Sequence, residues 1–305
     1  MGKFSNMSIL GKRLFPYALV LPAAVALLMF SVYPLVSAIW NSFTSIGWIT
    51  DHAHFVGLAN YRQILVGNIG TAEMFYDALG HTILWTVVVV AGQFLIGMVV
   101  AMVMNERFPG RGLFRTATLA PIAVPFVILA LTWRWMYDPY YGIINFYLQK
   151  LGLLSGPRMW VGNTSSPLYP LIIVAIWRGF PFMSLMLLSG LQGIPQELYE
   201  AAKVDGASGI ARLFYITLPQ MRTIITIALM LHVLWWWNHF ETFMIVGSAG
   251  GDYARNAATL PYLAWNEAFR WSHLSLGAAI SVMAMVLMVG VIVWNARREA
   301  RTVSE

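Results

Sequence analysis

A short aromatic and polar run lies inside an otherwise apolar block of the sequence. It reads Trp235-Trp236-Trp237-Asn238-His239-Phe240-Glu241, and an earlier apolar block carries the pair Trp177-Arg178. Aromatic faces stack on the apolar faces of ring-shaped solutes, while amide, imidazole, carboxylate and guanidinium groups form hydrogen bonds with hydroxyls. Ionisable side chains at membrane depth cost about 2.5–3.5 kcal/mol, which makes them functional candidates. The residues that we predict to line a path for a hydroxyl-rich solute are Trp177, Arg178, Trp235, Asn238, His239 and Glu241.

These polar and aromatic residues also have structural interpretations. Arg178 could hydrogen-bond a solute, or it could form an internal ion pair with Glu241. Successive residues of a helix point about 100° apart, so at least one residue of Trp235–Trp237 must face lipid or a neighbouring helix. Pro181 removes a backbone hydrogen bond and is expected to kink the helix beside Arg178, where exposed backbone groups are tolerated only along a cavity. His232 lies one helical turn before this tryptophan run.

Two other histidine positions are weaker candidates. His81 lies near the start of an apolar block, and we expect it to be structural. His52 and His54 form an H-x-H pair, which is a weak signal for a metal site without further ligands. The sequence therefore predicts no metal centre, and the chain has no cysteine.

The stretch of residues 192–222 is polar and predicts two short helices. The first, Gln196–Asp205, follows Pro195, a residue suited to the beginning of a helix. Gly206 is a natural C-terminal cap, because glycine adopts a left-handed backbone without strain. A second segment, Ala207–Leu218, follows directly.

The first of these two helices needs a surface to pack on, because it is too short to be stable alone in water. Its face formed by Leu198, Ala201, Ala202 and Asp205 has the spacing i, i+3, i+4, i+7. The two alanines leave room for close approach. The residues alone permit two interpretations, a helix in a groove of another protein or a helix resting on lipid headgroups.

Six apolar blocks of the sequence must position the predicted path residues and the polar stretch 192–222. The chain is 59% hydrophobic and only 10% charged, far below the roughly 25% charge of a soluble domain. Each block approaches or exceeds the roughly 20 residues that a spanning helix needs. The composition therefore predicts an all-α integral membrane protein with six transmembrane helices at Tyr17–Trp40, Ala78–Met104, Leu113–Tyr137, Leu168–Leu191, Ile224–Val246 and Leu274–Trp294.

The basic residues predict the orientation of these spans. The N-terminus, the loops at 105–115 and 192–222, and the C-terminus together carry twelve Lys and Arg, whereas the other loops carry five. Positive residues accumulate on the cytoplasmic side, so both termini and the 192–222 loop are expected in the cytoplasm. The net charge of +6 is thus explained by orientation, without nucleic acid as a partner.

The chain lacks the sequence of a phosphate-binding loop. No segment matches G-x-x-x-x-G-K-[ST], and Gly11-Lys12-Arg13 lacks both the upstream glycine and the hydroxyl residue. We therefore expect no catalytic residues and no cofactor bound by this chain.

The 192–222 loop resembles the EAA signature of ABC importer permeases. Glu200-Ala201-Ala202, then Gly206, then Ile216-Thr217-Leu218-Pro219 reproduces the complete spacing EAA-x3-G-x9-I-x-LP. In that family the loop forms a coupling helix that inserts into a cleft of the ATP-binding subunit. The residues that the resemblance assigns to this contact are Glu200, Ala201, Ala202, Asp205, Gly206, Ile216, Leu218 and Pro219.

The resemblance extends to the carbohydrate-type (MalF-like) branch of these permeases. The stretches Ile194–Ala207 and Phe55–Tyr61 look like that branch, as do Trp133-Arg134-Trp135 and Asp138-Pro139 in the third block. A Gly-Gly-Pro typical of the branch is replaced by the run Ala249-Gly250-Gly251-Asp252. The resemblance implies import of a sugar or sugar-derived solute.

The resemblance also implies the assembly around the chain. Residues 1–305 would be a single permease domain of the type I ABC importer fold, in a bacterial cytoplasmic membrane. The partners would be a second permease subunit, a dimer of ATP-binding subunits that holds ATP-Mg, and an extracytoplasmic solute-binding protein. Two other classes remain as alternatives: an ion-coupled secondary carrier, for which Glu241 is the clear intramembrane carboxylate, and a non-transporting scaffold.

Overall fold

The computed structural model describes residues 9–46, 53–67, 71–161, 168–241, 243 and 257–303. Within these residues the elements are helical, apart from one short antiparallel pair of strands, β1 (Thr44–Ser45) and β2 (His54–Phe55). The predicted all-helical fold is therefore confirmed. The chain forms two compact units. Unit 1 comprises residues up to 68 together with 264–283, and unit 2 comprises 69–263 together with 284–305.

The structure supports between four and six membrane spans within the described residues. Four helical stretches are long and apolar enough to cross a bilayer by themselves: Tyr17–Ser42, Ala72–Asn105, Leu168–Gln192 and Leu274–Arg298. Two further spans exist if each of two bent helix pairs counts as one, namely Arg111–Ala123 with Phe126–Met136 and Gly209–Gln220 with Arg222–Trp237. These pairs correspond to the third and fifth apolar blocks of the sequence.

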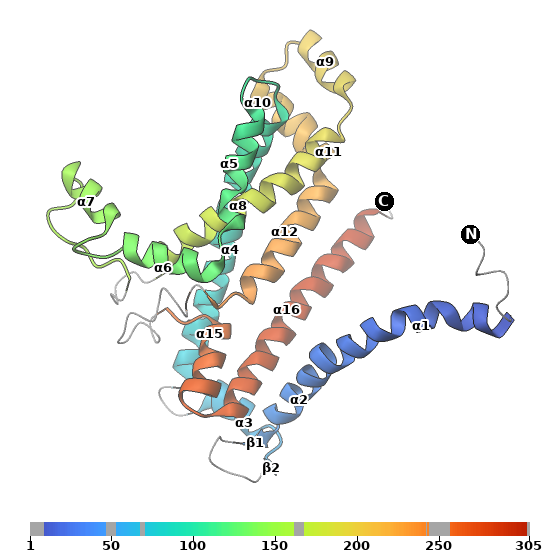
Figure 1. Cartoon of the computed structure of the whole chain (residues 1–305), viewed down its shortest axis with the longest axis vertical. Coiled ribbons are helices and arrows are strands. Elements are labelled where there is room, and N and C mark those ends of the chain that lie inside the picture. The colour runs from blue at the N-terminus through green and yellow to red at the C-terminus, as the bar shows by residue number, and fades with distance from the viewer. Residues whose placement is uncertain are drawn as a thin grey trace. The chain divides into compact units, whose positions relative to one another are not determined.

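Unit 1 begins with one long helical stretch and ends with a helical corner. The stretch consists of α1 (Ile9–Leu27), the π-helical turn η1 (Leu28–Val32) and α2 (Tyr33–Ser42) (Figure 1). The remaining elements of this unit are β1, β2, α3 (Ala59–Val66), the end of α15 (Leu260–Trp265), η3 (Asn266–Arg270) and the first turns of α16 (Leu274–Val303).

The turn after β2 is held by a buried asparagine. Gly57 has a φ of 56°, a left-handed value that suits glycine, and it reverses the chain before α3. From the first turn of α3, Asn60 donates to the carbonyls of Ser42 and Thr44 at 2.9 and 2.8 Å. The hydroxyls of Tyr61 and Ser42 lie 2.6 Å apart. These contacts explain why the Phe55–Tyr61 stretch combines glycine, asparagine and tyrosine at its spacing.

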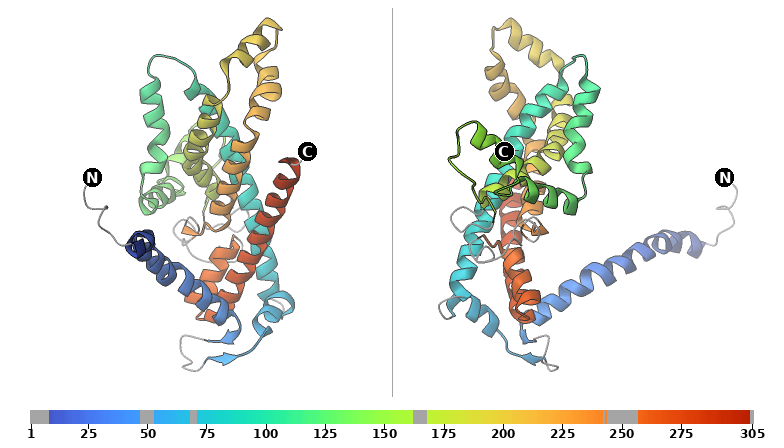
Figure 2. Two further views of the ribbon diagram at one scale, coloured as in Figure 1. Left: turned by 90° about the vertical axis from the view of Figure 1, so that its right-hand side faces the viewer. Right: turned by 60° about the vertical axis from the view of Figure 1, so that its left-hand side comes forward.

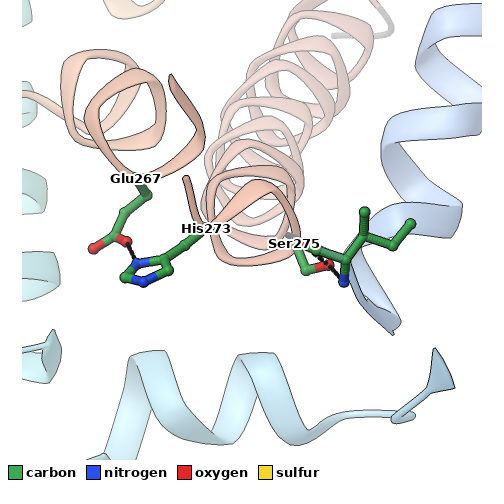
Figure 3. A network of polar contacts seen from close by, with 4 residues as sticks. Glu267, His273 and Ser275 are labelled. Atoms are coloured by element: carbon green, nitrogen blue, oxygen red, sulfur yellow. Dashed lines mark hydrogen bonds and ion pairs between the residues drawn. The ribbon is translucent and has the colours of Figure 1, made fainter. Parts of the chain in front are cut away.

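The start of α16 is fastened to the end of the strand pair (Figure 3). The Ser275 hydroxyl accepts a hydrogen bond from the amide of Ile46 at 2.7 Å. Just before α16, the nearly buried carboxylate of Glu267 in η3 lies 2.9 Å from Nδ1 of His273. These contacts hold the corner between η3 and α16.

Unit 2 is built around a pair of long helices that lie side by side, α4 (Thr71–Asn105) and α8 (Leu168–Gln192) (Figures 1 and 2). α12 (Arg222–Trp237) packs against both of them, and α5 (Arg111–Ala123) packs against α8. The other described elements of this unit are α6 (Phe126–Met136), α7 (Ile143–Lys150), α9 (Gln196–Val204), α10 (Gly209–Arg212), η2 (Leu213–Thr217), α11 (Leu218–Gln220), the start of α15 and the part of α16 from residue 284 onward.

Glycines let α4 and α8 approach closely. A Cβ at Gly92 would lie 2.4 Å from the Ile176 side chain, and one at Gly97 would lie 2.8 Å from Cγ of Met183 and 3.2 Å from the backbone nitrogen of Ser184. Small residues at such contacts are typical of helices packed within a bilayer, where dispersion contacts and not the hydrophobic effect drive association.

The Gly97→Ala variant is expected to destabilise the protein by about 1–2 kcal/mol, since the new methyl group overpacks the interface with α8. Gly290→Ala is a matched control, because nothing lies within 4 Å of the added Cβ in α16. There the better helix propensity of alanine should stabilise the helix by up to about 1 kcal/mol. Thermal midpoints of the detergent-solubilised assembly, measured in parallel, should shift in opposite directions. A shift of equal size and sign in both variants would contradict the packing argument.

The third apolar block, predicted as one span over Leu113–Tyr137, is divided into two helices. α5 and α6 meet at an angle of 93°. Pro125 causes the break, since a proline disfavours helical geometry in the residue before it, and Val124 has an extended ψ of 125°. Pro125 itself precedes α6 with a ψ of 138°. The break brings the end of α5 and the start of α6 close to α8.

Pro181, which the sequence suggested can kink its helix, lies inside α8, and the helix continues past it. The helix runs from Leu168 to Gln192 without a break, with Pro181 inside it. The Ser184 hydroxyl donates to the Pro181 carbonyl at 2.7 Å. The fifth block is shorter than predicted, since α12 ends at Trp237. The run Ala249–Asp252 and His52 lie outside the described residues.

Candidate functional site

α9 ends in a glycine-dependent motif. Gly206 follows Asp205 with a φ of 76°. Its amide donates to the carbonyl of Lys203 at 3.1 Å, and the amide of Ala207 donates to that of Ala202 at 2.9 Å. This pair of hydrogen bonds is a Schellman motif, which requires a left-handed residue at the position of Gly206. The glycine predicted as a helix cap is therefore confirmed in that structural role.

α9 is a polar, exposed helix at one end of unit 2, beyond the ends of α8 and α12 (Figures 1 and 2). Glu200 and Ala201 are exposed, and Ala202 is half-buried. The Tyr199 hydroxyl lies 2.9 Å from the hydroxyl of Thr217 in η2, which ties α9 to the segment that follows. The helix begins at Gln196, as predicted, and ends at Val204, one residue earlier than predicted.

The second half of the loop supports α9. Ser208 caps α10 by accepting a hydrogen bond from the amide of Ala211 at 3.2 Å. Ile216 lies in the π-helical turn η2, and Leu218 and Pro219 begin α11. Ile216 and Leu218 are half-buried, whereas Pro219 is exposed. The eight residues predicted for a coupling contact thus occupy one continuous helical loop, and α9 presents its own residues outward.

A cavity of about 260 Å³ lies among α5, α6, α8, α12 and the residues after α12. Its lining combines aromatic rings with groups that form hydrogen bonds. Four predicted path residues are among the ten that line it, which are Ile122, Phe126, Arg178, Gly179, Phe182, His232, Trp235, Trp236, His239 and Glu241.

Arg178 fastens the broken third span to α8. Its guanidinium donates to the carbonyls of Pro121 and Val124 at 2.7 and 3.0 Å. These carbonyls end α5 and lack helical donors, because the chain turns away at Pro125. The guanidinium also lies 5.7 Å from the ring centre of Phe126. The direct hydrogen bonds of Arg178 are thus to backbone carbonyls, and Glu241 lines the same cavity.

Glu241 instead faces a histidine. Its carboxylate lies 3.0 Å from Nδ1 of His239, and half of the Glu241 side chain is exposed. The His239 ring stacks on Trp85 with 6.3 Å between ring centres and an angle of 9°. Glu241 and His239 thus form a polar pair, and the His239 ring of this pair packs on the ring of Trp85.

The three successive tryptophans have three different surroundings. Trp235 is 63% exposed and lines the cavity, with Phe182 at 5.5 Å. Trp236 is buried against Trp85 and also lines the cavity. Trp237 is buried and donates to the carbonyl of Ala284 at 3.2 Å. The prediction that they cannot all face one path is confirmed.

Two predicted path residues lie outside the cavity lining. Trp177 packs edge-on against Trp133 with ring centres 5.8 Å apart. Asn238 is exposed and donates to the carbonyl of Leu234 in its own helix at 3.0 Å. The direction of Trp177 follows from helix rotation, since neighbouring residues of a helix point about 100° apart. Asn238 lies beyond the end of α12.

A buried polar pair that was not among the predicted path residues lies beside the cavity, Gln93 on α4 and His232 on α12. Their side chains are hydrogen-bonded to each other. Their signal in the sequence was the occurrence of a glutamine and a histidine in two apolar blocks, since buried polar groups in a membrane need partners. His81 has the structural role predicted for it, with Nδ1 at 3.2 Å from the carbonyl of Ala258. Among the described residues, no group of three or more His, Asp or Glu could hold a metal ion.

The fold and the site define a polytopic α-helical membrane protein with a mixed aromatic and polar cavity between its helices. Residues 93–302 match the family model described as "Binding-protein-dependent transport system inner membrane component". This match covers more than half of the chain. The chain belongs to this family of ABC importer permease subunits, which are multi-pass inner membrane proteins without catalytic activity, and the ATPase is a separate subunit.

Relatives and a solved structure resemble the chain over nearly its whole length. The trehalose/maltose transport system permease protein MalF of Thermococcus litoralis is 34% identical, over 90% of this chain and 89% of that protein. The sn-glycerol-3-phosphate transport system permease protein UgpA of Yersinia pestis bv. Antiqua is 30% identical, over 94% and 95%. A chain of a bacterial ABC transporter involved in the import of the acidic polysaccharide alginate has the same fold, with a TM-score of 0.80 at 20% identity, and the match covers 97% of this chain and 98% of that one.

Proposed function

We propose that this permease forms half of the path for an uncharged sugar or sugar-derived solute. The observation that carries the proposal is the lining of the 260 Å³ cavity, where Trp235, Trp236 and Phe182 offer aromatic faces beside groups that bind hydroxyls. The volume is just below the range of about 300–1,000 Å³ for small-molecule sites, which suits one half of a site that a second permease subunit completes.

The charges in the cavity favour an uncharged solute. The lining residues include one arginine and one glutamate, Arg178 and Glu241, so their charges balance within the cavity. An anionic solute would bring a further negative charge that this lining does not compensate. Relatives are named for an uncharged sugar and for a phosphate ester, so relatedness does not decide the charge of the solute.

The exposed α9 supports the second part of the proposal, which is a contact between the loop at 192–222 and the ATP-binding subunit. Its outward residues Glu200 and Ala201 would meet a cleft of that subunit, and the Schellman motif at Gly206 gives the helix a defined end. This contact requires the loop and both termini to be cytoplasmic, as the distribution of Lys and Arg favours. ATP-Mg would be bound by the dimer of ATP-binding subunits.

The assembly that we propose also contains a second permease subunit and an extracytoplasmic solute-binding protein, in the cytoplasmic membrane of a prokaryote. The family is described as binding-protein-dependent, which supports the solute-binding protein as a partner. The same family membership weighs against an ion-coupled carrier. The cavity weighs against a non-transporting scaffold.

The experiment that tests the proposal is uptake by proteoliposomes that contain the full assembly with its ATP-binding subunits and binding protein. We expect ATP-dependent uptake of radiolabelled maltose or trehalose and no uptake driven by a proton gradient alone. Uptake without ATP, or ATP-dependent uptake restricted to anionic solutes, would refute the proposal.

Replacing Trp235 with alanine should raise the KM for the sugar about threefold to tenfold, because stacking of an aromatic ring contributes about 0.5–1.5 kcal/mol beyond burial. The maximal rate should change little if Trp235 contacts the solute before the slow step. Trp294→Ala is the matched control, since Trp294 is 62% exposed on α16 and does not line the cavity in the described part of the chain. Equal KM values for the two variants would remove Trp235 from the path.

A further inference from the structure

Gln93 connects three helices through one side-chain amide. The residue is completely buried on α4, and Nε2 donates to the carbonyl of Ala175 on α8 at 2.9 Å. That carbonyl can only accept, so its contact determines which end of the amide is the nitrogen. Gly179 provides the space, because a Cβ there would lie 2.1 Å from Nε2. The oxygen Oε1 consequently points toward α12.

The orientation of Gln93 determines the tautomer of His232. Oε1 of Gln93 lies 2.5 Å from Nδ1 of His232, a completely buried ring on α12. Since the amide oxygen only accepts, Nδ1 must carry the proton, and Nε2 of the neutral ring is then an acceptor. Nε2 is buried and has no hydrogen-bond partner among the described residues. His232 lines the cavity.

A buried donor lies one helical turn away. Trp236 follows His232 at i+4, a spacing that places both side chains on the same face of α12. Its indole Nε1, which can only donate, is also buried without a partner in the described part of the chain. The backbone carbonyl of Trp236 accepts from Nε1 of Trp85 at 3.1 Å, which holds this turn in place.

An acceptor and a donor on one wall match the hydrogen bonding of a hydroxyl group. A hydroxyl donates one hydrogen bond and accepts others, so its chemistry is complementary to an acceptor at Nε2 of His232 and a donor at Nε1 of Trp236. Buried groups that lack partners are costly, and a bound solute or water would remove that cost. A methyl group in the same place would leave both unsatisfied.

We propose that His232 and Trp236 form a hydroxyl-selecting pair and that Gln93 is the positioning residue that makes His232 an acceptor. The inference rests on the proposed function, because it assumes that a polyhydroxylated solute enters this cavity. It adds the chemistry by which one hydroxyl is distinguished, and it assigns a role to a residue on α4 that does not line the cavity.

The first experiment measures the tautomer by ¹⁵N NMR of the purified assembly with ¹⁵N-histidine in this chain. The His232 resonances, identified by their loss in His232→Phe, should report a neutral ring protonated at Nδ1. In Gln93→Met, which keeps the length of the side chain but removes the amide, they should change to a mixture of tautomers. Gln149→Met is the matched control, since Gln149 is exposed on α7. A wild-type ring protonated at Nε2, or an unchanged tautomer in Gln93→Met, would overturn the inference.

The second experiment measures selectivity with maltose, trehalose and their monodeoxyfluoro derivatives in proteoliposomes. Fluorine cannot donate to Nε2, so replacement of the selected hydroxyl should lower ATP-dependent uptake by roughly tenfold relative to the parent sugar. In Gln93→Met the ring can present an N–H instead, and discrimination at that position should fall to about threefold or less, with other positions unaffected. A merely structural role of Gln93 would lower uptake of all the sugars equally.

The outcomes of the two experiments separate the inference from the proposed function. Uptake of the parent sugars with equal tolerance of fluorine at every position would overturn the inference and leave the function intact. A Gln93-dependent tautomer without uptake of either sugar would refute the proposed function and the selection of a hydroxyl, while the positioning of His232 by Gln93 would stand.

Discussion

Replacing Gly206 with valine is expected to lower ATP-driven uptake by roughly tenfold to a hundredfold while the protein still inserts into the membrane. Gly206 ends α9 in a left-handed conformation with a φ of 76°. A non-glycine residue there costs about 1–3 kcal/mol, and more for a β-branched one. Every 1.4 kcal/mol changes a population about tenfold, so the Schellman end of α9 would be formed in only a small fraction of molecules.

Steric clash does not explain the predicted loss, because nothing lies within 4 Å of a Cβ built at Gly206. The effect is therefore confined to the backbone, and the thermal stability of the assembly should change little. Gly209→Val is the matched control, because Gly209 lies in the same loop without a positive φ. The measurements are uptake and solute-stimulated ATPase activity in proteoliposomes.

Two results would contradict the role proposed for Gly206. If Gly206→Val, combined with Glu200→Ala, supported normal uptake with full coupling to ATP hydrolysis, α9 would not be the contact with the ATPase. If Gly206→Val and Gly209→Val lost uptake equally, the left-handed conformation would not be the cause.

Replacing Arg178 with methionine is expected to reduce both stability and transport. The change removes two charge-assisted hydrogen bonds and leaves the carbonyls of Pro121 and Val124 without a donor from α8. A hydrogen bond to a charged group contributes about 1.5–3 kcal/mol, so the loss should be about 3 kcal/mol if the two bonds are partly redundant. The end of α5 would then lose its connection to α8, and the cavity would lose a wall.

Two comparisons separate this structural role of Arg178 from direct binding of the solute. Arg178→Lys retains a charged donor and should restore part of the thermal stability. Arg134→Met removes an arginine from the exposed end of α6 and should leave the stability nearly unchanged. Thermal midpoints and the KM for the sugar should be measured together. A raised KM at unchanged stability in Arg178→Met would show that Arg178 binds the solute and does not hold the third span.

Features that depend on a few consecutive residues could be predicted from the sequence. Gly206 was recognised as a helix cap, because its role depends on the backbone of its own turn. The long apolar blocks correspond to α8 and α16 within a few residues, since each must be apolar along its whole length to be stable in lipid. The break at Pro125 was not predicted, since one span was expected over Leu113–Tyr137, although its cause lies in the local sequence.

The composition of the cavity was predicted only in part. Arg178, Trp235, His239 and Glu241 belong to it, whereas Trp177 and Asn238 point elsewhere. Neighbouring residues of a helix differ by about 100° in direction, so a run of candidates cannot show which of them faces inward.

The sequence by itself determined the class of the protein, since apolar length, basic loops and the spacing from Glu200 to Pro219 are properties of short segments. Only the tertiary structure decided how the polar residues are used. Arg178 binds the backbone of a distant span, and Gln93 on α4 orients His232 on α12. Such contacts depend on how helices far apart in the chain rotate and pack, because in lipid a buried polar group takes whichever partner the packing brings within reach.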